Sequence, residues 1–135
     1  MFYSFMRSFV LLTIIGCVGT DPSKPGNGTP LVGRWGGEHI ALVLTDSVGS
    51  VEYDCAHGGI AGPVQPLGGR FEVTGVHVRE HGGPVREGER PDTVPARYLG
   101  HVRGDRLELR VVVAGDSLGP FELRRGAEPR LFKCL

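Results

Sequence analysis

Histidine and carboxylate side chains recur between residues 38 and 81, and such groups bind metal ions or move protons. A zinc site needs three or four nitrogen, sulfur or oxygen ligands that converge on one point. His77 and His81 have the H-x-x-x-H spacing of metal ligands, but the sequence around them predicts a strand and not the helix that brings two such ligands together. In a strand, neighbouring residues point to opposite faces, so each Glu-His pair offers at most one ligand to a face. The candidate ligands are Glu38, His39, Glu52, Asp54, His57, His77 and His81.

These ligands leave two hypotheses open. One is a metal-dependent enzyme that uses His57 and His81 together with carboxylates. The other is favoured by the absence of a helical ligand motif and places the histidines at sheet edges and in loops, bonded to the backbone or to carboxylates. On that interpretation we expect no metal and no other cofactor.

A serine motif follows an apolar run near the C-terminus. The stretch "VVVAGDSLG" (111–119) matches G-x-S-x-G and resembles the G-D-S-L motif of the GDSL hydrolases, which implies a nucleophilic Ser117. A nucleophilic serine needs a base, and in both families the histidine comes later in the chain. The eighteen residues after Ser117 contain no histidine. We therefore expect a turn between two strands here, and no catalytic residue.

The longest irregular stretch is "REHGGPVREGERPDTVP" (79–95). Long loops in compact domains are often functional, and mixed charges fit a polar recognition rim. An ordinary solvated connection is the alternative. Acidic and basic residues are interspersed along the whole chain, without the basic stripe that nucleic-acid binding needs. We expect no nucleic-acid partner.

The chain opens with "MFYSFMRSFVLLTIIGC", in which Arg7 is the only charge before Cys17. The apolar run is shorter than the roughly 20 residues of a membrane-spanning helix, so residues 1–16 are typical of a secretory signal peptide. "IIGC" resembles the bacterial lipobox, which implies cleavage before Cys17 and lipid attachment to it. The resemblance places the protein in the bacterial cell envelope, membrane-anchored through its lipid. Plain secretion or a periplasmic location, and a retained anchor, are the alternatives.

Residues 17–30 consist of Cys17, the expected site of lipid attachment, and a segment rich in Pro and Gly. This composition predicts a flexible tether. Residues 31–135 are enough for a single domain with one core. Cys55 and Cys134 remain, and two cysteines in an exported domain most simply form a disulfide. Two buried free thiols are the alternative.

Runs of alternating apolar residues, bounded by glycine, predict strands rather than helices. Gly75 predicts a bulge or bend inside one of them. Gly104-Asp105 predicts a two-residue type II′ hairpin turn. The expected strands are "HIALVLT" (39–45), "SVEYDCA" (50–56), "RFEVTGVHVRE" (70–80), "ARYLGHV" (96–102), "RLELRVVVA" (106–114), "PFELRR" (120–125) and "RLFKC" (130–134).

The Gly104-Asp105 turn fixes a register that can be checked. It sets Tyr98 opposite Val111 and Gly100 opposite Leu109 on an apolar face, with His101 opposite Glu108 on the polar face. One buried and one wet face indicate an antiparallel sheet. Without helices to cover it, we predict an all-β domain, a small up-and-down β-barrel. A two-sheet β-sandwich is the alternative.

"GRW" at residues 33–35 resembles the G-x-W motif of lipocalin-like barrels. This resemblance implies that Trp35 plugs one barrel end, with Arg124 or Arg125 of a late strand packed over it. Residues 33–134 are also similar to a group of small exported bacterial proteins, which implies no activity. The segments that carry this similarity are "GRWGGEHI", "EYDCAHG", "GRFEV", "EHGGPVR", "PARYLG" and "LFKCL".

An eight-stranded barrel can be filled by its own side chains or can hold one small ligand. Bulky inward residues favour a filled barrel. We therefore predict a binding or interaction module of the cell envelope, for a small ligand or an envelope protein, with the 79–95 stretch and the rims as its surface. A lipocalin-like carrier of a small apolar ligand is the alternative. The expected inward residues are Trp35, Phe71, Tyr98, Leu107, Leu109, Val111 and Phe121.

Overall fold

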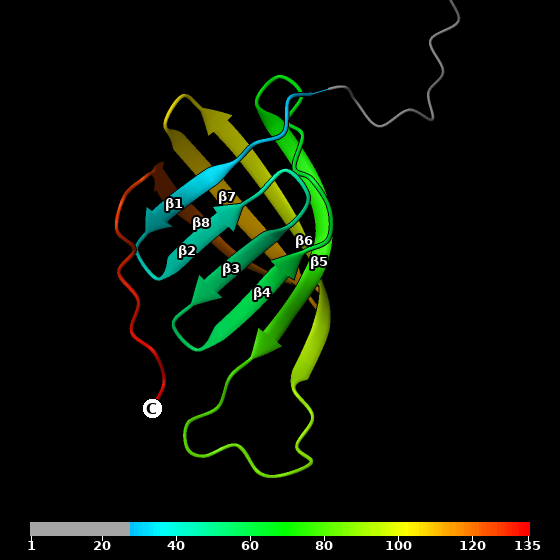
Figure 1. Ribbon diagram of the computed structural model, residues 1–135, viewed down its shortest axis with the longest axis vertical. Coiled ribbons are helices and arrows are strands. Elements are labelled where there is room, and N and C mark those ends of the chain that lie inside the picture. Colours follow the sequence, from blue (N-terminus) through cyan, green and yellow to red (C-terminus); the bar gives the residue numbers. More distant parts are fainter. Residues whose placement is uncertain (1–27) are drawn as a thin grey trace, which may run out of the picture.

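The computed structural model describes residues 28–135, which form a closed barrel of eight antiparallel strands (Figure 1). Each strand pairs with the next, and β8 pairs with β1, so the all-β up-and-down barrel is confirmed and the sandwich is excluded. No helix in the described part of the chain could span a membrane. The predicted signal peptide, Cys17 and the tether up to residue 27 lie outside the described residues. The strands are β1 (Gly33–Gly37), β2 (Ile40–Leu44), β3 (Gly49–Tyr53), β4 (Ala56–Ile60), β5 (Arg70–Arg79), β6 (Asp92–Arg103), β7 (Arg106–Val113) and β8 (Asp116–Arg125).

The β6–β7 hairpin has the predicted register. Tyr98 lies opposite Val111, Gly100 opposite Leu109, and His101 opposite Glu108. Gly104 in the turn has a φ of 61°, as the first position of a type II′ turn requires. The apolar partners of this hairpin are buried.

The barrel interior is filled by side chains. Trp35, Tyr98, Leu107, Leu109 and Val111 are at most 1% exposed, Phe71 is 9% exposed, and Phe121 is partly buried against the same cluster. The inward-pointing glycines make room for the rings. A Cβ on Gly100 would overlap the Phe71 ring, and one on Gly58 would overlap the Tyr98 hydroxyl. The interior is therefore a packed core.

Trp35 closes the barrel core near the end where the described chain begins. The Arg125 guanidinium lies 4.3 Å from the centre of the Trp35 ring, in a cation–π contact. Arg125 also donates a hydrogen bond of 2.7 Å from Nη1 to the Val32 carbonyl. The packing of a late-strand arginine over Trp35 is thus confirmed, with Arg125 in that role.

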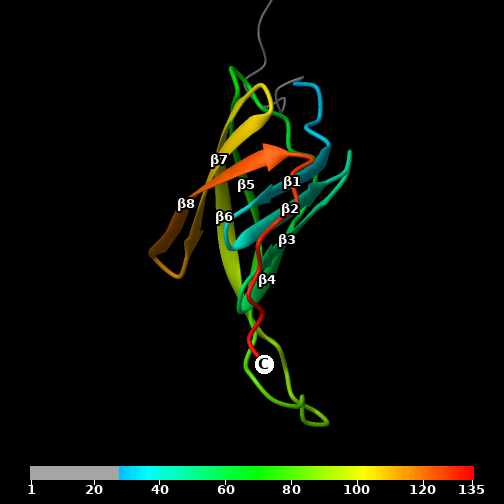
Figure 2. The same cartoon turned by 90° about the vertical axis from the view of Figure 1, so that its left-hand side faces the viewer.

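Two local predictions were wrong, and a third was wrong in part. Residues 50–56 are two strands, because the chain reverses at Asp54-Cys55 between β3 and β4. Residues 130–134 form no strand: Arg130 makes one isolated bridge to Glu38, and the tail then runs along the outside of the barrel (Figure 2). Gly75 causes no bulge, since β5 pairs without a shift on both sides, and a Cβ there would overlap the Gly59 carbonyl oxygen.

The barrel has two distinct ends. The N-terminal end is the end at which residues 28–32 lie. The connections 45–48, 61–69 and 104–105 lie at the same end. The loop end carries the 80–91 connection from β5 to β6, together with the turns at 54–55 and 114–115. Figure 1 shows the two ends opposite one another.

Candidate binding site at the loop end

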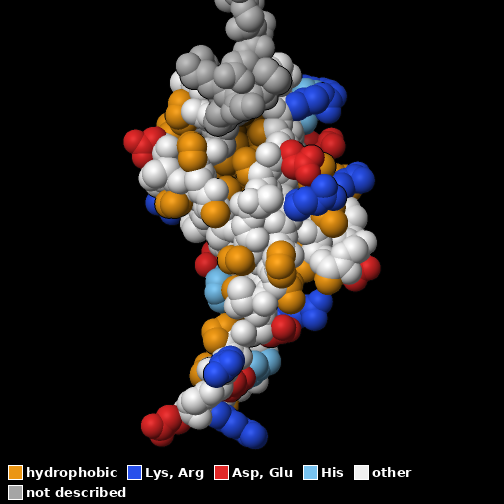
Figure 3. Space-filling view, turned by 90° about the vertical axis from the view of Figure 1, so that its right-hand side faces the viewer, with side chains coloured by type: hydrophobic (Ala, Val, Ile, Leu, Met, Phe, Trp, Pro, Cys, Tyr) orange, Lys and Arg blue, Asp and Glu red, His pale blue; other side chains and the backbone are white. Residues whose placement is uncertain are grey.

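The 80–91 loop encloses a hollow on the outer surface, which we name the loop hollow, of about 390 Å³. Apolar groups from Val78, Val85 and Pro91 contribute to its wall; Val78 is 9% exposed and Val85 is 77% exposed. Figure 3 shows the loop projecting beyond the barrel with hydrophobic, charged and histidine side chains mixed on its surface. The other lining residues are His57, Arg79, Glu80, His81, Glu89, Arg90 and Asp92.

The loop is held in shape by contacts between its two halves. His81 bonds through Nε2 to the Glu89 carboxylate and through Nδ1 to the Gly82 carbonyl, at 3.1 Å. The Arg86 amide donates to Glu89 Oε2 at 2.9 Å. The Gly82 carbonyl and then Glu89 raise the pKa of His81, because both acceptors favour its protonated form. The loop therefore presents a defined surface.

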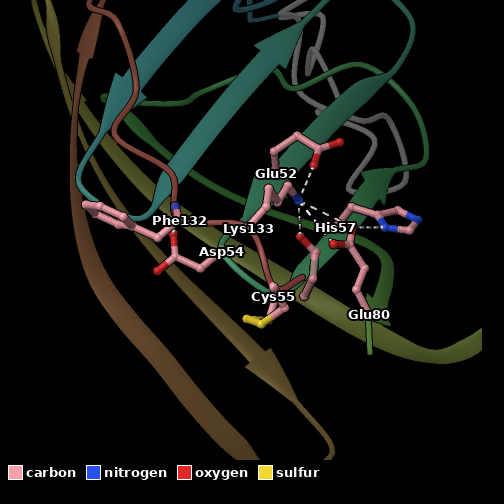
Figure 4. Close-up of polar contacts among 9 residues, drawn as sticks. Glu52, Asp54, Cys55, His57, Glu80, Phe132 and Lys133 are labelled. Atoms are coloured by element: carbon pink, nitrogen blue, oxygen red, sulfur yellow. Dashed lines mark hydrogen bonds and ion pairs between the residues drawn. A yellow bond between two sulfur atoms is a disulfide. The ribbon is translucent and has the colours of Figure 1, made fainter. Parts of the chain in front are cut away.

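A charged network lies beside the base of the loop (Figure 4). His57 Nδ1 bonds to Glu80 Oε1 at 2.8 Å. The Lys133 ammonium donates to Glu52 Oε2 at 2.8 Å and reaches Glu80 Oε2 at 3.3 Å. The hydrogen bond from His57, with the help of Lys133, lowers the pKa of Glu80. The network links β3, β4, the loop and the C-terminal tail.

The tail is fixed against the β3–β4 turn. A disulfide joins Cys55 and Cys134, the pair that the sequence predicted, with Cα atoms 5.2 Å apart. Asp54 Oδ1 accepts a hydrogen bond of 2.8 Å from the Phe132 amide, and Asp54 Oδ2 lies 2.7 Å from His39 Nδ1. The Phe132 amide and then His39 lower the pKa of Asp54. The tail thus buttresses the loop end from one side.

The candidate metal ligands do not converge. Among residues 28–135 no group of three or more His, Cys, Asp or Glu side chains could hold a metal ion. His57 and His81 both line the loop hollow, but each bonds to a different carboxylate. His39 bonds to Asp54 near the tail, and His77 points into the barrel. Residues 28–135 therefore bring together no set of metal ligands, and the metal-dependent enzyme stays a prediction.

His77 is the buried polar residue of the interior. It is 6% exposed, and its Nδ1 has no hydrogen-bond partner in the described part of the chain. Tyr53 lies against it, with ring centres 5.2 Å apart. Burial, and next the charge of Arg79, lower the pKa of His77 below its usual value. The folded protein therefore disfavours the protonated imidazole.

This burial predicts a loss of stability in mild acid. The contribution of His77 is complete above the pKa of an unfolded histidine, about 6.5, and is lost as the pH falls to the lowered folded pKa. Within that window the loss is at most about 1.4 kcal/mol per pH unit. We expect His77→Gln to flatten the pH dependence of urea unfolding midpoints across this window. A slope that is unchanged in His77→Gln would contradict the expectation.

Ser117 lies in β8 opposite Val112, after the turn at Ala114-Gly115. Within residues 28–135 it makes no hydrogen bond to a histidine. The turn lies two to three residues before the serine, so Ser117 belongs to the strand and not to the turn.

Sequence reasoning missed Lys133 and Glu89, which organise the loop end. A signal for Lys133 was present in the sequence. A disulfide between Cys134 and Cys55 places Lys133, which precedes Cys134, beside the strand that holds Glu52. Glu89 carried no such signal, because its contact with His81 depends on how the loop folds back on itself.

The comparisons with known proteins add no relative: no protein-family model, no curated protein and no solved structure matches this chain.

Proposed function

We propose that this protein is a lipid-tethered binding module of the bacterial cell envelope. Cys17 carries the lipid anchor, and the loop end recognises an envelope protein or a small ligand in the loop hollow. The observation that carries the proposal is the combination of a filled barrel interior with a shaped hollow outside it.

The loop hollow has the dimensions of a recognition site. Small-molecule sites span roughly 300–1,000 Å³ and combine an apolar lining with a few placed polar groups. A hollow of about 390 Å³ lies near the lower limit, so it fits a small ligand or a side chain of a partner protein. The interior offers a carrier no comparable space, because large side chains occupy it. We therefore favour recognition at the loop end over a carrier function.

The two ends of the barrel suit a tethered module. Residues 28–32 lead into β1 at the N-terminal end. The 80–91 connection, whose residues line the loop hollow, projects from the opposite end of the barrel (Figure 1). The ten residues of β5 connect the two ends and span about 33 Å. A lipid on Cys17 would therefore be attached at the end of the barrel remote from the loop hollow. The lipobox-like "IIGC" supports the tether.

Site-specific photo-cross-linking in the living bacterium tests this proposal. A photoreactive residue at Val85, which lines the loop hollow, should give a discrete adduct with one partner. The matched control is Val76, which is 40% exposed on β5 and does not line the hollow. No adduct from Val85, or the same adduct from both positions, would contradict recognition at the loop end.

A further inference from the structure

Exposed arginines gather at the N-terminal end of the barrel. Three of them lie side by side across adjacent strands, because Arg103 of β6 is opposite Arg106 of β7, and Arg106 is opposite Arg124 of β8. We name these three residues the arginine row. Arg70 of β5 lies opposite His101, two positions before Arg103.

The arginine row has no counter-ion within the described residues. No carboxylate of residues 28–135 forms an ion pair with Arg103, Arg106 or Arg124. Glu108 and Glu122 are opposite one another in the next row and line one surface hollow with Arg103 and Arg106, yet neither of them forms an ion pair within residues 28–135. Like charges directly opposite on neighbouring strands destabilise a sheet. The row therefore suits an external anion.

The loop end has the opposite character. Most of its carboxylates are paired: Glu52 and Glu80 with Lys133, and Asp92 with Arg79. The positive charge at the N-terminal end also affects the pKa of His101. Burial, followed by the charges of Arg70 and Arg103, lowers the pKa of His101. Arg86 and Arg90 on the loop are also unpaired within residues 28–135, but at the N-terminal end three unpaired arginines lie directly opposite one another on neighbouring strands.

Exposed apolar side chains accompany these arginines. Leu67 is 62% exposed and pairs with Arg70 in an isolated bridge. Val32 is 46% exposed, and its carbonyl accepts the hydrogen bond from Arg125. Basic residues next to exposed apolar side chains fit a phospholipid surface, where the charges meet headgroups and the apolar groups meet the acyl boundary.

We propose that the arginine row, together with Arg70, Val32 and Leu67, is a docking surface for anionic phospholipid headgroups. The segment from residue 18 to residue 30 reaches at most about 45 Å, so a lipid on Cys17 would hold this end near a bilayer. That orientation rests on the proposed tether. The affinity of the surface for anionic lipid does not rest on it, because the charges lie within the barrel itself.

Vesicle sedimentation tests the docking surface without the lipid anchor. The protein used is the mature chain from residue 18, whose strands and disulfide all lie within residues 28–135. We expect it to bind vesicles of phosphatidylcholine mixed with phosphatidylglycerol, and not vesicles of phosphatidylcholine alone. Binding should weaken as salt is raised, because exposed charges are screened.

Two triple variants distinguish binding by the arginine row from an effect of the net charge of the protein. Replacing Arg103, Arg106 and Arg124 with Gln should weaken the vesicle partition about 100-fold, since each arginine near an anionic surface contributes about 1 kcal/mol. The control replaces Arg86, Arg90 and Arg110, which make no ion pair within residues 28–135, and should retain most of the binding. The arginine-row variant should be at least as stable as the wild type in thermal unfolding, because it removes opposed like charges.

The proposal is overturned if the unlipidated chain binds neither vesicle, binds both equally, or loses as much affinity in the control as in the arginine-row variant. None of these results bears on the loop hollow, and none depends on lipid at Cys17. A failure of the docking surface and a failure of the proposed function are therefore distinguishable.

Discussion

Replacing both Cys55 and Cys134 with serine should lower the free energy of unfolding by about 4 kcal/mol. The disulfide joins residues 79 positions apart, so it closes a long loop in the unfolded chain and restricts its conformational freedom. The barrel should still form, because its strands are paired by backbone hydrogen bonds and its core is packed without either sulfur. Equilibrium unfolding in urea near neutral pH measures the change.

The single Cys55→Ser variant and the reduced wild type provide the controls, since each removes the same bond. Both should lose about as much stability as the double variant. The tail should also loosen, and the Phe132 amide, which bonds to Asp54, should exchange faster with solvent. A change in unfolding free energy below about 1 kcal/mol in the double variant would show that the disulfide does little to stabilise the fold.

Gly100→Ala should destabilise the barrel by roughly 1–3 kcal/mol, the usual cost of overpacking a core. A Cβ at this position would overlap the Phe71 ring, which fills the space beside Gly100 in the interior. Phe71 is 9% exposed and forms part of the core cluster, so the ring can move aside only by displacing its neighbours. Thermal or urea unfolding of the purified domain measures the loss.

Gly59→Ala is the matched control for Gly100→Ala. The nearest atoms to a Cβ on Gly59 lie 3.8 Å and 3.9 Å away, which is ordinary contact distance. This change should stay within about 0.5 kcal/mol of the wild type. Equal effects at the two positions would contradict a filled interior and would revive a carrier with space for a ligand.

The sequence predicted those parts of the fold that are set by local patterns. The Gly104-Asp105 turn fixes the β6–β7 register because two residues leave a hairpin little freedom, and alternation then assigns each face. Trp35 could be placed under a late-strand arginine only through the resemblance to G-x-W barrels. Which arginine packs there depends on the β1–β8 pairing, which sets Trp35 opposite Arg125.

The wrong predictions concern features that long-range contacts decide. The alternation in "SVEYDCA" continues through Asp54-Cys55, so the run has the pattern of one strand. The reversal there is stabilised from afar, as the Glu80 amide donates to the Cys55 carbonyl at 3.0 Å. "RLFKC" also alternates, but β8 closes onto β1 and leaves no edge for another strand. The loop hollow likewise arises from residues of β4, β5 and the loop, which no local pattern brings together.

The measurement that tests the tethered module most directly is the intact mass of the mature protein extracted from the membranes of its own bacterium. We expect a chain that begins at Cys17, carries the mass of a diacylglycerol and an additional acyl chain, and lacks two hydrogens because Cys55 and Cys134 are joined. A chain that begins elsewhere, without lipid mass, would contradict the tether and leave a freely diffusing barrel in its place.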